Sequence, residues 1–234
     1  MDYENNPVCI IGARKGSKRL PKKNQLPINN IPLYLYTVQA ALDSKIFKKV
    51  FFSTDDEVII AGLKDHSEII LDVRPSEIAT SNVSMMEVTN YIIQKYNQNF
   101  HGNRDIVIMT PCNPLRNSKH ICEAYNLFKK NNANSLVSLT EFPFPVERSL
   151  EIKNNRIIKS WDGRIDTSRF NKRYYPNGAI VIINQNQLIK FQNFYLQDTI
   201  GYIMKWPYSI DIDYEDDYMM AKMLIENNLL ADIV

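Results

Sequence analysis

The 234-residue sequence predicts an α/β fold built on a doubly wound, mostly parallel sheet. Short, continuously apolar runs alternate along the chain with longer segments of helical periodicity, which is the pattern of βαβ units. Such runs are typical of strands that helices cover on both faces. The alternation is interrupted at about residues 141–175 and then resumes. We therefore expect a single domain over residues 1–234, with an arm inserted at about 141–175.

The expected strands are short runs rich in Val, Ile, Leu and Phe. The first of them is "VCII", which directly follows the polar N-terminal residues. In chain order, the expected strands cover residues 8–11, 50–54, 68–73, 105–110, 134–140, 179–183 and 208–213.

The helices between the strands are expected from apolar spacing and from their capping residues. Pro32 opens the first helix, because proline is favoured in the first helical turn. Asp55 and Asp56 can cap the N-terminus of the second helix. Ser84, with Glu87 three residues on, has the pattern of a capping box. The expected helices cover residues 32–44, 56–65, 85–96, 118–130 and 214–230.

The interruption at 141–175 contains prolines and short alternating runs, with few helical stripes. This pattern favours hairpins over helices. We therefore expect the segment to leave the main sheet as an arm.

Composition limits the classes of function. The net charge is only +2, whereas a general nucleic-acid binder is more often basic over a whole face. The sequence has no apolar run long enough to span a membrane. Its three cysteines, Cys9, Cys112 and Cys122, lack the spacing of a metal site, which favours a reduced, cytoplasmic protein.

A basic loop follows the first expected strand. The segment "IIGARKGSKRLPKKN", residues 10–24, carries six cations. Ligands of doubly wound sheets bind beyond the carboxyl ends of the strands, so these cations are placed to neutralise phosphates, and Gly16 lets backbone N–H groups approach closely. The phosphate-loop pattern of ATPases is not met. The cations alone are equally compatible with a solvated turn or a nucleic-acid patch.

The segment "SIDID", residues 209–213, places two carboxylates two residues apart. On a strand, residues i and i+2 face the same side, so Asp211 and Asp213 can converge. Such a pair suits Mg²⁺, which binds through one or two carboxylates together with phosphate oxygens. Alternatively, Asp213 caps the following helix and Asp211 is solvated.

The basic loop resembles the N-terminal signature of the acylneuraminate cytidylyltransferases, or CMP-sialic acid synthetases. That signature reads roughly A-R-x-x-S-K-x-(I/L)-P-x-K-N. The matching residues are Ala13, Arg14, Ser17, Lys18, Leu20, Pro21, Lys23 and Asn24. The family has a Rossmann-like nucleotidyltransferase fold and joins a nonulosonic acid to CMP, using CTP and Mg²⁺ and releasing pyrophosphate.

The resemblance implies a set of nucleotide contacts and catalytic residues. "RPSEIATSNVSMMEV" resembles the family segment that lies around the cytosine. The implied CTP contacts are Ala13, Arg14, Ser17, Lys18, Lys23, Asn24, Arg74 and Ser84. The implied catalytic residues are Arg14, Lys23 and Asp211. The family has the same S-I-D-I-D near its C-terminus as its metal site, which implies Asp211 and Asp213 as ligands of Mg²⁺.

Two further segments imply the contacts to the sugar acid. "TPCNPLR" resembles the family's Q-P-T-S-P-L-R with Thr110 in place of Gln, and "YYPNGAIVI" resembles R-P-N-G-A-I-Y with Tyr175 in place of Arg. The implied sugar-acid contacts are Thr110, Arg116, Arg148, Arg169 and Asn177. In the family the arm serves dimerisation, and one of its basic residues, here Arg148, reaches the neighbouring subunit's sugar pocket.

The expected function is transfer of CMP from CTP to a nonulosonic acid by a cytoplasmic homodimer, with no nucleic-acid or membrane partner. One alternative is a cytidylyltransferase for a related acid: legionaminic, pseudaminic or keto-deoxyoctonic acid. A second alternative is a metal-dependent glycosyltransferase, because such an enzyme also combines a nucleotide-binding sheet with a D-x-D motif. A nucleic-acid-binding module is a third, and it leaves "SIDID" unexplained.

Overall fold

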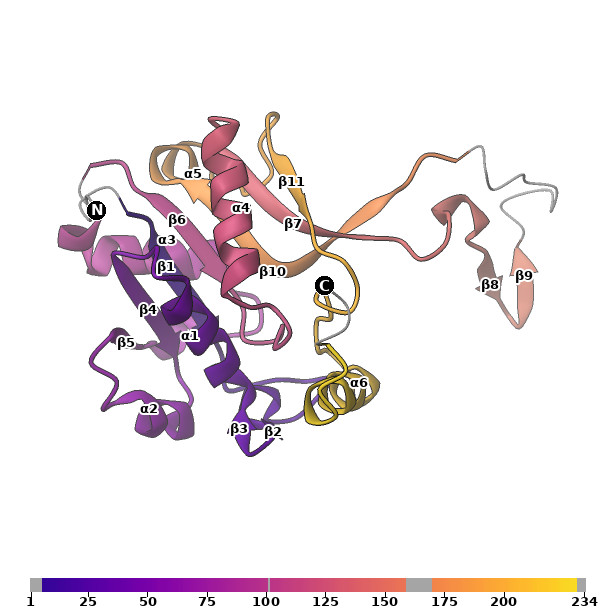
Figure 1. The fold of residues 1–234 in the computed structure, drawn as a ribbon, viewed down its shortest axis with the longest axis horizontal. Coiled ribbons are helices and arrows are strands. Elements are labelled where there is room, and N and C mark those ends of the chain that lie inside the picture. The colour runs from indigo at the N-terminus through magenta and orange to yellow at the C-terminus, as the bar shows by residue number, and fades with distance from the viewer. Residues whose placement is uncertain (1–5, 101, 159–169, 231–234) are drawn as a thin grey trace.

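The computed structural model describes residues 6–100, 102–158 and 170–230. Its centre is a seven-stranded sheet with the strand order β11-β7-β10-β6-β1-β4-β5 (Figure 1). In chain order the strands are β1 (Val8–Ala13), β4 (Lys49–Thr54), β5 (Ile69–Val73), β6 (Asp105–Met109), β7 (Ser135–Glu141), β10 (Tyr174–Asn184) and β11 (Ile200–Ile203).

The sheet is mostly parallel. β1 pairs in parallel with β4 and β6, β4 with β5, and β7 with β11. β10 runs antiparallel to both of its neighbours, β6 and β7. The predicted doubly wound, mostly parallel α/β fold is confirmed, with β10 as the reversed strand.

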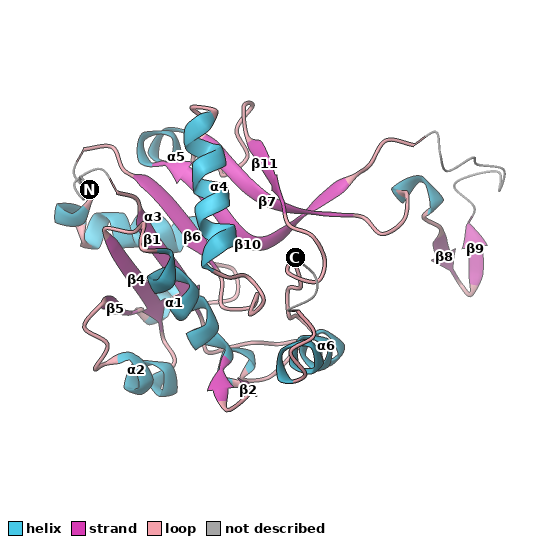
Figure 2. Cartoon of the chain, in the orientation of Figure 1, coloured by secondary structure: helices cyan, strands magenta, loops and turns pink. Residues whose placement is uncertain are grey.

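Helices cover both faces of the sheet (Figure 2). Alternate residues of β1 show this division, because successive side chains of a strand point to opposite faces. Cys9 and Ile11 pack in a core with α1 (Leu33–Ser44), α2 (Glu57–Leu63) and α4 (Ser118–Lys130). Val8 and Ile10 pack in a second core with α3 (Met85–Lys95) and α5 (Gln185–Phe191). A third core joins α6 (Glu215–Glu226) to the segment after β1 and to Ile212.

The predicted caps are largely confirmed. The Asp56 carboxylate accepts a hydrogen bond from the backbone N–H of Val58 at the start of α2. Ser84 and Glu87 form the expected capping box of α3. Pro32 precedes α1 as its N-cap instead of lying in the first turn. Its fixed φ still suits this place, because the cap residue lies outside the helical conformation.

Two parts of the C-terminal region differ from the prediction. Residues 208–213 form no strand; the segment is held by side chains and by the loop after β6. The edge strand β11 and the seven-residue helix α5 were not predicted. Both are short, so their local patterns are weak, and β7, the strand that pairs with β11, lies far away in the sequence.

Short elements complete the described chain. β2 (Pro27–Ile28) and β3 (Ile31–Pro32) form a small hairpin after the basic loop. The short 3₁₀ helices are η2 (Lys23–Gln25), η3 (Ser76–Ile78), η4 (Asn97–Asn99) and η5 (Val146–Arg148). Within the described residues, no helix is both long and apolar enough to cross a membrane.

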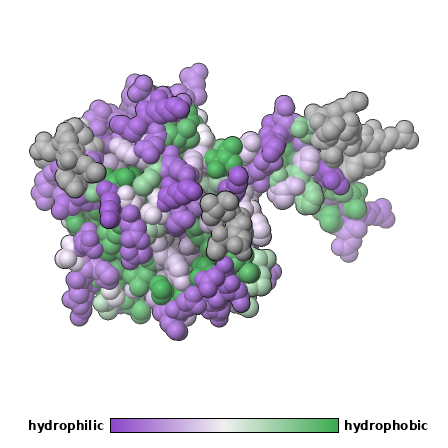
Figure 3. All heavy atoms as spheres, viewed as in Figure 1, coloured by the Kyte–Doolittle hydropathy of each residue, from purple (hydrophilic) through white to green (hydrophobic). Residues whose placement is uncertain are grey.

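The described segment 142–158, which follows β7, projects from the body of the molecule (Figures 1 and 3). Its described part carries η5 and a hairpin of β8 (Glu151–Lys153) and β9 (Arg156–Ile158). Apolar side chains on it are exposed, among them Phe144, Ile152 and Ile157. This projecting segment, which we call the projecting arm, lies within the range 141–175 expected for an insertion; residues 159–169 of that range lie outside the described residues.

Candidate active site

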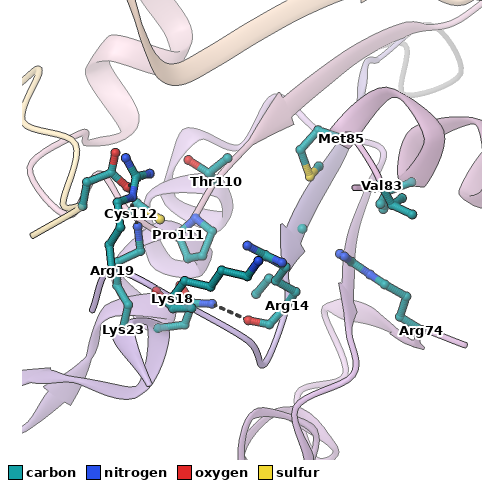
Figure 4. Close-up of a pocket in the computed structure, with 16 residues that line it drawn as sticks. Arg14, Lys18, Arg19, Lys23, Arg74, Val83, Met85, Thr110, Pro111 and Cys112 are labelled. Atoms are coloured by element: carbon teal, nitrogen blue, oxygen red, sulfur yellow. Dashed lines mark hydrogen bonds and ion pairs between the residues drawn. The ribbon is translucent and has the colours of Figure 1, made fainter. Parts of the chain in front are cut away.

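A cavity of about 390 Å³ opens where the neighbouring parallel strands β1 and β6 end. Doubly wound sheets bind ligands at this edge, outside the carboxyl ends of their strands. Figure 4 shows the cavity and labels ten of its side chains. Its lining residues are Gly12, Ala13, Arg14, Ser17, Lys18, Arg19, Lys23, Asn24, Arg74, Val83, Met85, Val88, Thr110, Pro111, Cys112 and Asp213.

Cations dominate the ionisable groups of this cavity, which we call the cationic cavity. Its charged lining residues are Arg14, Lys18, Arg19, Lys23, Arg74 and a single carboxylate, Asp213. In Figure 4, Arg74 lies on one side of the cavity and Lys23 and Arg19 lie on the other. A concave site lined by one sign of charge concentrates ions of the opposite sign. The cavity is therefore suited to a polyanion such as a triphosphate.

Lys23 is the most enclosed lysine of the cavity. Its backbone belongs to η2 and its side chain is buried, with Nζ donating to the carbonyl of Ile212 and lying 3.0 Å from Asp213 Oδ1. Burial opposes the charge on the ammonium group, but interactions with Cys112 and Asp213 outweigh it and hold the pKa of Lys23 above its ordinary value. Lys23 is therefore a charged, fixed donor at the cavity wall.

Asn24 links the loop to the cavity. Its Nδ2 donates a 3.2 Å hydrogen bond to the carbonyl of Arg14, which fixes the backbone where the basic loop leaves β1. Its Oδ1 is buried and has no hydrogen-bond partner among the described residues. Because an unpaired buried acceptor costs free energy, Asn24 Oδ1 is a natural acceptor for a ligand donor.

Arg74 follows β5 and is buried at the far wall. Its guanidinium donates to the carbonyl of Ser53 at 2.8 Å and to the Ser53 hydroxyl at 3.2 Å. That hydroxyl in turn donates to the buried carboxylate of Asp72. Burial lowers the pKa of Arg74, yet a guanidinium stays protonated in proteins. Its remaining N–H groups are available to the cavity.

Gly12 is required by the packing of this cavity. A Cβ at residue 12 would lie 2.4 Å from Met85 Sδ and 3.1 Å from the Arg74 guanidinium. The methionine end is flexible, so we expect Gly12→Ala to keep the fold and to push Met85 into the cavity. If Met85 must be displaced again when the cavity fills, an overpacking cost of about 1–3 kcal/mol falls on the complex, and affinity for the CTP expected from the sequence drops by roughly 5- to 150-fold. Calorimetric titration with CTP measures this loss, and unchanged affinity would contradict the assigned packing.

Seven of the eight expected CTP contacts line the cationic cavity, and Ser84 does not. Ala13, Arg14, Ser17, Lys18, Lys23, Asn24 and Arg74 line the cationic cavity. Ser84 is exposed, and its hydroxyl is engaged with Glu87 in the capping box of α3. Its neighbours Val83 and Met85 line the cavity instead. The segment is thus at the cavity, and its capping serine is used for the helix.

A second cavity, of about 480 Å³, adjoins the first through Asp213, which lines both. Its lining residues are Tyr175, Pro176, Asn177, Trp206, Ser209, Ile210, Asp211, Asp213, Tyr214 and Asp217. We call it the acidic cavity, because its three aspartates are its charged lining residues. Its aromatic rings and convergent polar groups are typical of a site for a polar small molecule.

Asp211 and Asp213 lie at the junction of the two cavities. Burial, and next the charge of Asp213, raise the pKa of Asp211 to about 6. Asp213 forms ion pairs with Arg19 at 2.6 Å and with Lys23 at 3.0 Å. The backbone between them is tied down, because the N–H of Ile212 donates to the carbonyl of Cys112 at 2.9 Å.

The carboxylate pair fits Mg²⁺. Burial, and next the charge of Asp213, raise the pKa of Asp211, and a divalent cation held by the two carboxylates would offset both effects. No group of three His, Cys, Asp or Glu side chains that could hold a metal occurs in the described part of the chain. Two carboxylates are nevertheless a common set for Mg²⁺, which takes its other ligands from water and substrate phosphates.

The expected sugar-acid contacts are dispersed. Thr110 lines the cationic cavity and Asn177 the acidic cavity. Arg116 is almost fully buried and lines neither cavity; its guanidinium donates to the Ala179 carbonyl at 2.7 Å and to Thr37 Oγ1 at 2.6 Å. The Arg116 guanidinium therefore connects β10 to α1.

The two remaining arginines are on or beyond the arm. Arg148 ends η5, with its guanidinium 6.0 Å from the ring centre of Phe144. Arg169 lies outside the described residues. Neither side chain is among those that line the two cavities.

Sequence reasoning missed several residues that the fold brings to the site. Arg19 was visible as a cation of the basic loop, but its pairing with Asp213 was not. Cys112 was considered for its spacing from the other cysteines; burial raises the pKa of its thiol to about 11, which keeps it neutral at the cavity wall. Asn113 lies in the quoted segment "TPCNPLR", but its role was not visible, because its partners Asn177 and Ile210 are distant in sequence.

Two known proteins named as cytidylyltransferases are similar to this chain over most of its length. The N-acylneuraminate cytidylyltransferase of Escherichia coli is 32% identical over 219 residues, covering 92% of this chain and 51% of that protein. The pseudaminic acid cytidylyltransferase of Campylobacter jejuni is 29% identical over 94% of this chain and 97% of its own. This chain spans about half the length of its N-acylneuraminate relatives.

A solved structure shares the fold, and a family model matches most of the chain. The structure of CMP:2-keto-3-deoxy-manno-octonic acid synthetase complexed with CTP has a TM-score of 0.70 at 13% identity, covering 95% of this chain and 99% of that one. The family described as "Cytidylyltransferase" matches residues 8–231. The resemblance noted in the sequence is thereby confirmed, and the chain belongs to the cytidylyltransferase family.

Proposed function

We propose that this protein transfers CMP from CTP to the anomeric hydroxyl of a nonulosonic acid, giving a CMP-sugar and pyrophosphate. The observation that carries the proposal is the position of Asp213, whose side chain lines both the cationic and the acidic cavity. A triphosphate in the first and a sugar acid in the second would meet at the carboxylate pair. The names of the N-acylneuraminate and pseudaminic acid relatives support this substrate class.

CTP would bind in the cationic cavity. Arg14, Lys18 and Lys23 would face the triphosphate, and Arg74 would approach from the opposite wall. The unpaired Oδ1 of Asn24 would accept a hydrogen bond from the nucleotide. Phosphoryl transfer depends mainly on positioning and on charge neutralisation, which fixed cations supply without covalent chemistry.

The acidic cavity would hold the sugar acid with its anomeric hydroxyl toward the α-phosphorus. Asn177 and Ser209 offer hydrogen bonds, and Tyr175 and Trp206 offer apolar faces for the sugar ring. The new bond joins the anomeric oxygen to phosphorus, and the bond to the pyrophosphate oxygen breaks in line. Asp211 and Asp213 would hold Mg²⁺, which supplies neutralising charge at the phosphates.

The sugar carboxylate requires a cation that the described lining of the acidic cavity does not supply. We propose that the protein is a homodimer and that the projecting arm delivers Arg148 to the partner's acidic cavity, with Arg169 as the second candidate. The exposed apolar side chains of the arm are consistent with a contact to another chain.

The three free cysteines fit a cytoplasmic location.

Pyrophosphate release from purified protein tests the proposed reaction. The assay contains Mg²⁺, one of CTP, UTP, ATP or GTP, and one acid from N-acetylneuraminate, deaminated neuraminate, legionaminate, pseudaminate or keto-deoxyoctonate. We expect release with CTP and one of these acids, which then names the substrate. A folded protein that binds no CTP would refute the proposal.

A further inference from the structure

Asn113 occupies a buried junction below the two cavities. It lies in the loop after β6, is fully buried, and lines neither cavity. A buried amide is costly unless its polar atoms are paired. Each polar atom of the Asn113 side chain is in fact paired.

The Asn113 amide joins three segments. Its Nδ2 donates at 3.2 Å to the carbonyl of Asn177, in β10, and at 3.2 Å to the carbonyl of Ile210. Its Oδ1 accepts from the Thr110 hydroxyl, 3.1 Å away at the end of β6. One side chain thus connects the wall of the cationic cavity, the wall of the acidic cavity and the segment that carries the carboxylate pair.

The segment 209–213 depends on such ties, because it belongs to no strand. Ile210 accepts from Asn113, while Ile212 donates to the carbonyl of Cys112 and accepts from Lys23. Asp211 therefore lies between two anchored residues. Without the tie at Ile210, the N-terminal side of Asp211 keeps only the local bond from the Ile210 N–H to the Pro207 carbonyl, while Ile212 on the C-terminal side keeps its bonds to Cys112 and Lys23.

We infer that Asn113 is a positioning residue that sets the orientation of Asp211, and through it the geometry of the carboxylate pair, for the CMP transfer. This inference rests on the proposed function. Asn113 acts through the backbone and touches no substrate. Residues that orient metal-binding carboxylates commonly affect metal affinity and turnover by about 10- to 100-fold when replaced.

The variants Asn113→Ser and Asn113→Asp separate positioning from mere stability. Serine is too short to span both carbonyls, and aspartate keeps the shape of asparagine but removes both N–H donors. The matched control is Ser135→Ala. Ser135 is also fully buried and donates to the carbonyl of Phe194, tying two segments away from both cavities.

Kinetics with CTP and the acid identified by the assay above give the first readout. For either Asn113 variant we expect kcat to fall about 10- to 100-fold and half-saturating Mg²⁺ to rise, with the KM for CTP nearly unchanged. Ser135→Ala should lower the Tm and leave kcat and the Mg²⁺ dependence as in the wild type. An Asn113 variant that loses Tm but keeps both kinetic values would overturn the inference.

Hydrogen exchange of the free protein gives a readout that is independent of the reaction. We expect the Ile210 amide, which donates to the Pro207 carbonyl, to exchange faster in the Asn113 variants than in Ser135→Ala at equal distance below the Tm. Equal exchange rates would show that Asn113 does not hold this segment. If the tie is confirmed but the wild type releases no pyrophosphate, the proposed function fails and the structural tie stands.

Discussion

Replacing Lys23 with methionine is expected to lower kcat/KM for CTP by about 10²- to 10³-fold, the usual cost of removing one fixed electrostatic donor from an active site. Lys23 is the buried lysine of the cationic cavity, with its Nζ already aimed at the site by Ile212 and Asp213. Methionine keeps the length of the side chain and removes its charge. Steady-state pyrophosphate release measures the change.

Lys22→Met is the matched control for this variant. Lys22 directly precedes Lys23 in the chain, but its side chain is exposed and does not line the cationic cavity. It adopts a left-handed backbone conformation, φ 56°, which methionine would adopt at similar cost. The control should therefore keep kcat/KM close to that of the wild type. Equal losses in the two variants would mean that general positive charge, and not the fixed ammonium group of Lys23, supports the reaction.

Asp211→Asn is expected to abolish turnover and to stabilise the metal-free protein. Ionised Asp211 is the unfavourable form in the folded state, because burial and Asp213 raise its pKa from 3.8 to about 6. The protonated Asp211 carboxyl is the form that favours the folded state. This contribution to stability is fully present below about pH 3.8 and is lost as the pH rises through about 6. At pH 8 the neutral amide should therefore increase the free energy of unfolding by up to about 3 kcal/mol.

Urea unfolding at pH 8 in the presence of EDTA measures this gain. Asp213→Asn is the comparison, because it removes a carboxylate that pairs with Arg19 and Lys23, and we expect it to be neutral or destabilising. Both variants should lose turnover. A destabilised Asp211→Asn protein would contradict the interpretation that the two carboxylates are held together at a cost to the fold.

Much of the fold followed from local patterns. The buried run at β1 and the capping box at Ser84 and Glu87 are encoded by adjacent residues, so the sequence predicts them directly. The segment 209–213 has an equally clear alternation, but no strand within the described residues pairs with it. Whether an alternating run becomes a strand depends on its partners, which a local pattern does not reveal.

The site was predictable to the extent that its residues follow strands in recognisable motifs. Arg14, Lys23 and Arg74 do so, and all three line the cationic cavity. Arg116 also follows a strand, but it folds beneath the cavity and bonds to Thr37 and Ala179. A motif locates an arginine near a site, whereas the packing decides whether its guanidinium enters the cavity or braces the wall.

A crystal structure with CTP and Mn²⁺ in place of Mg²⁺ is the most direct test of the central claim, that the two cavities meet at a catalytic carboxylate pair. The account predicts the triphosphate against Arg14 and Lys23, and an anomalous manganese peak bound by Asp211 and Asp213. CTP bound away from the basic loop, or manganese bound away from these two carboxylates, would contradict it.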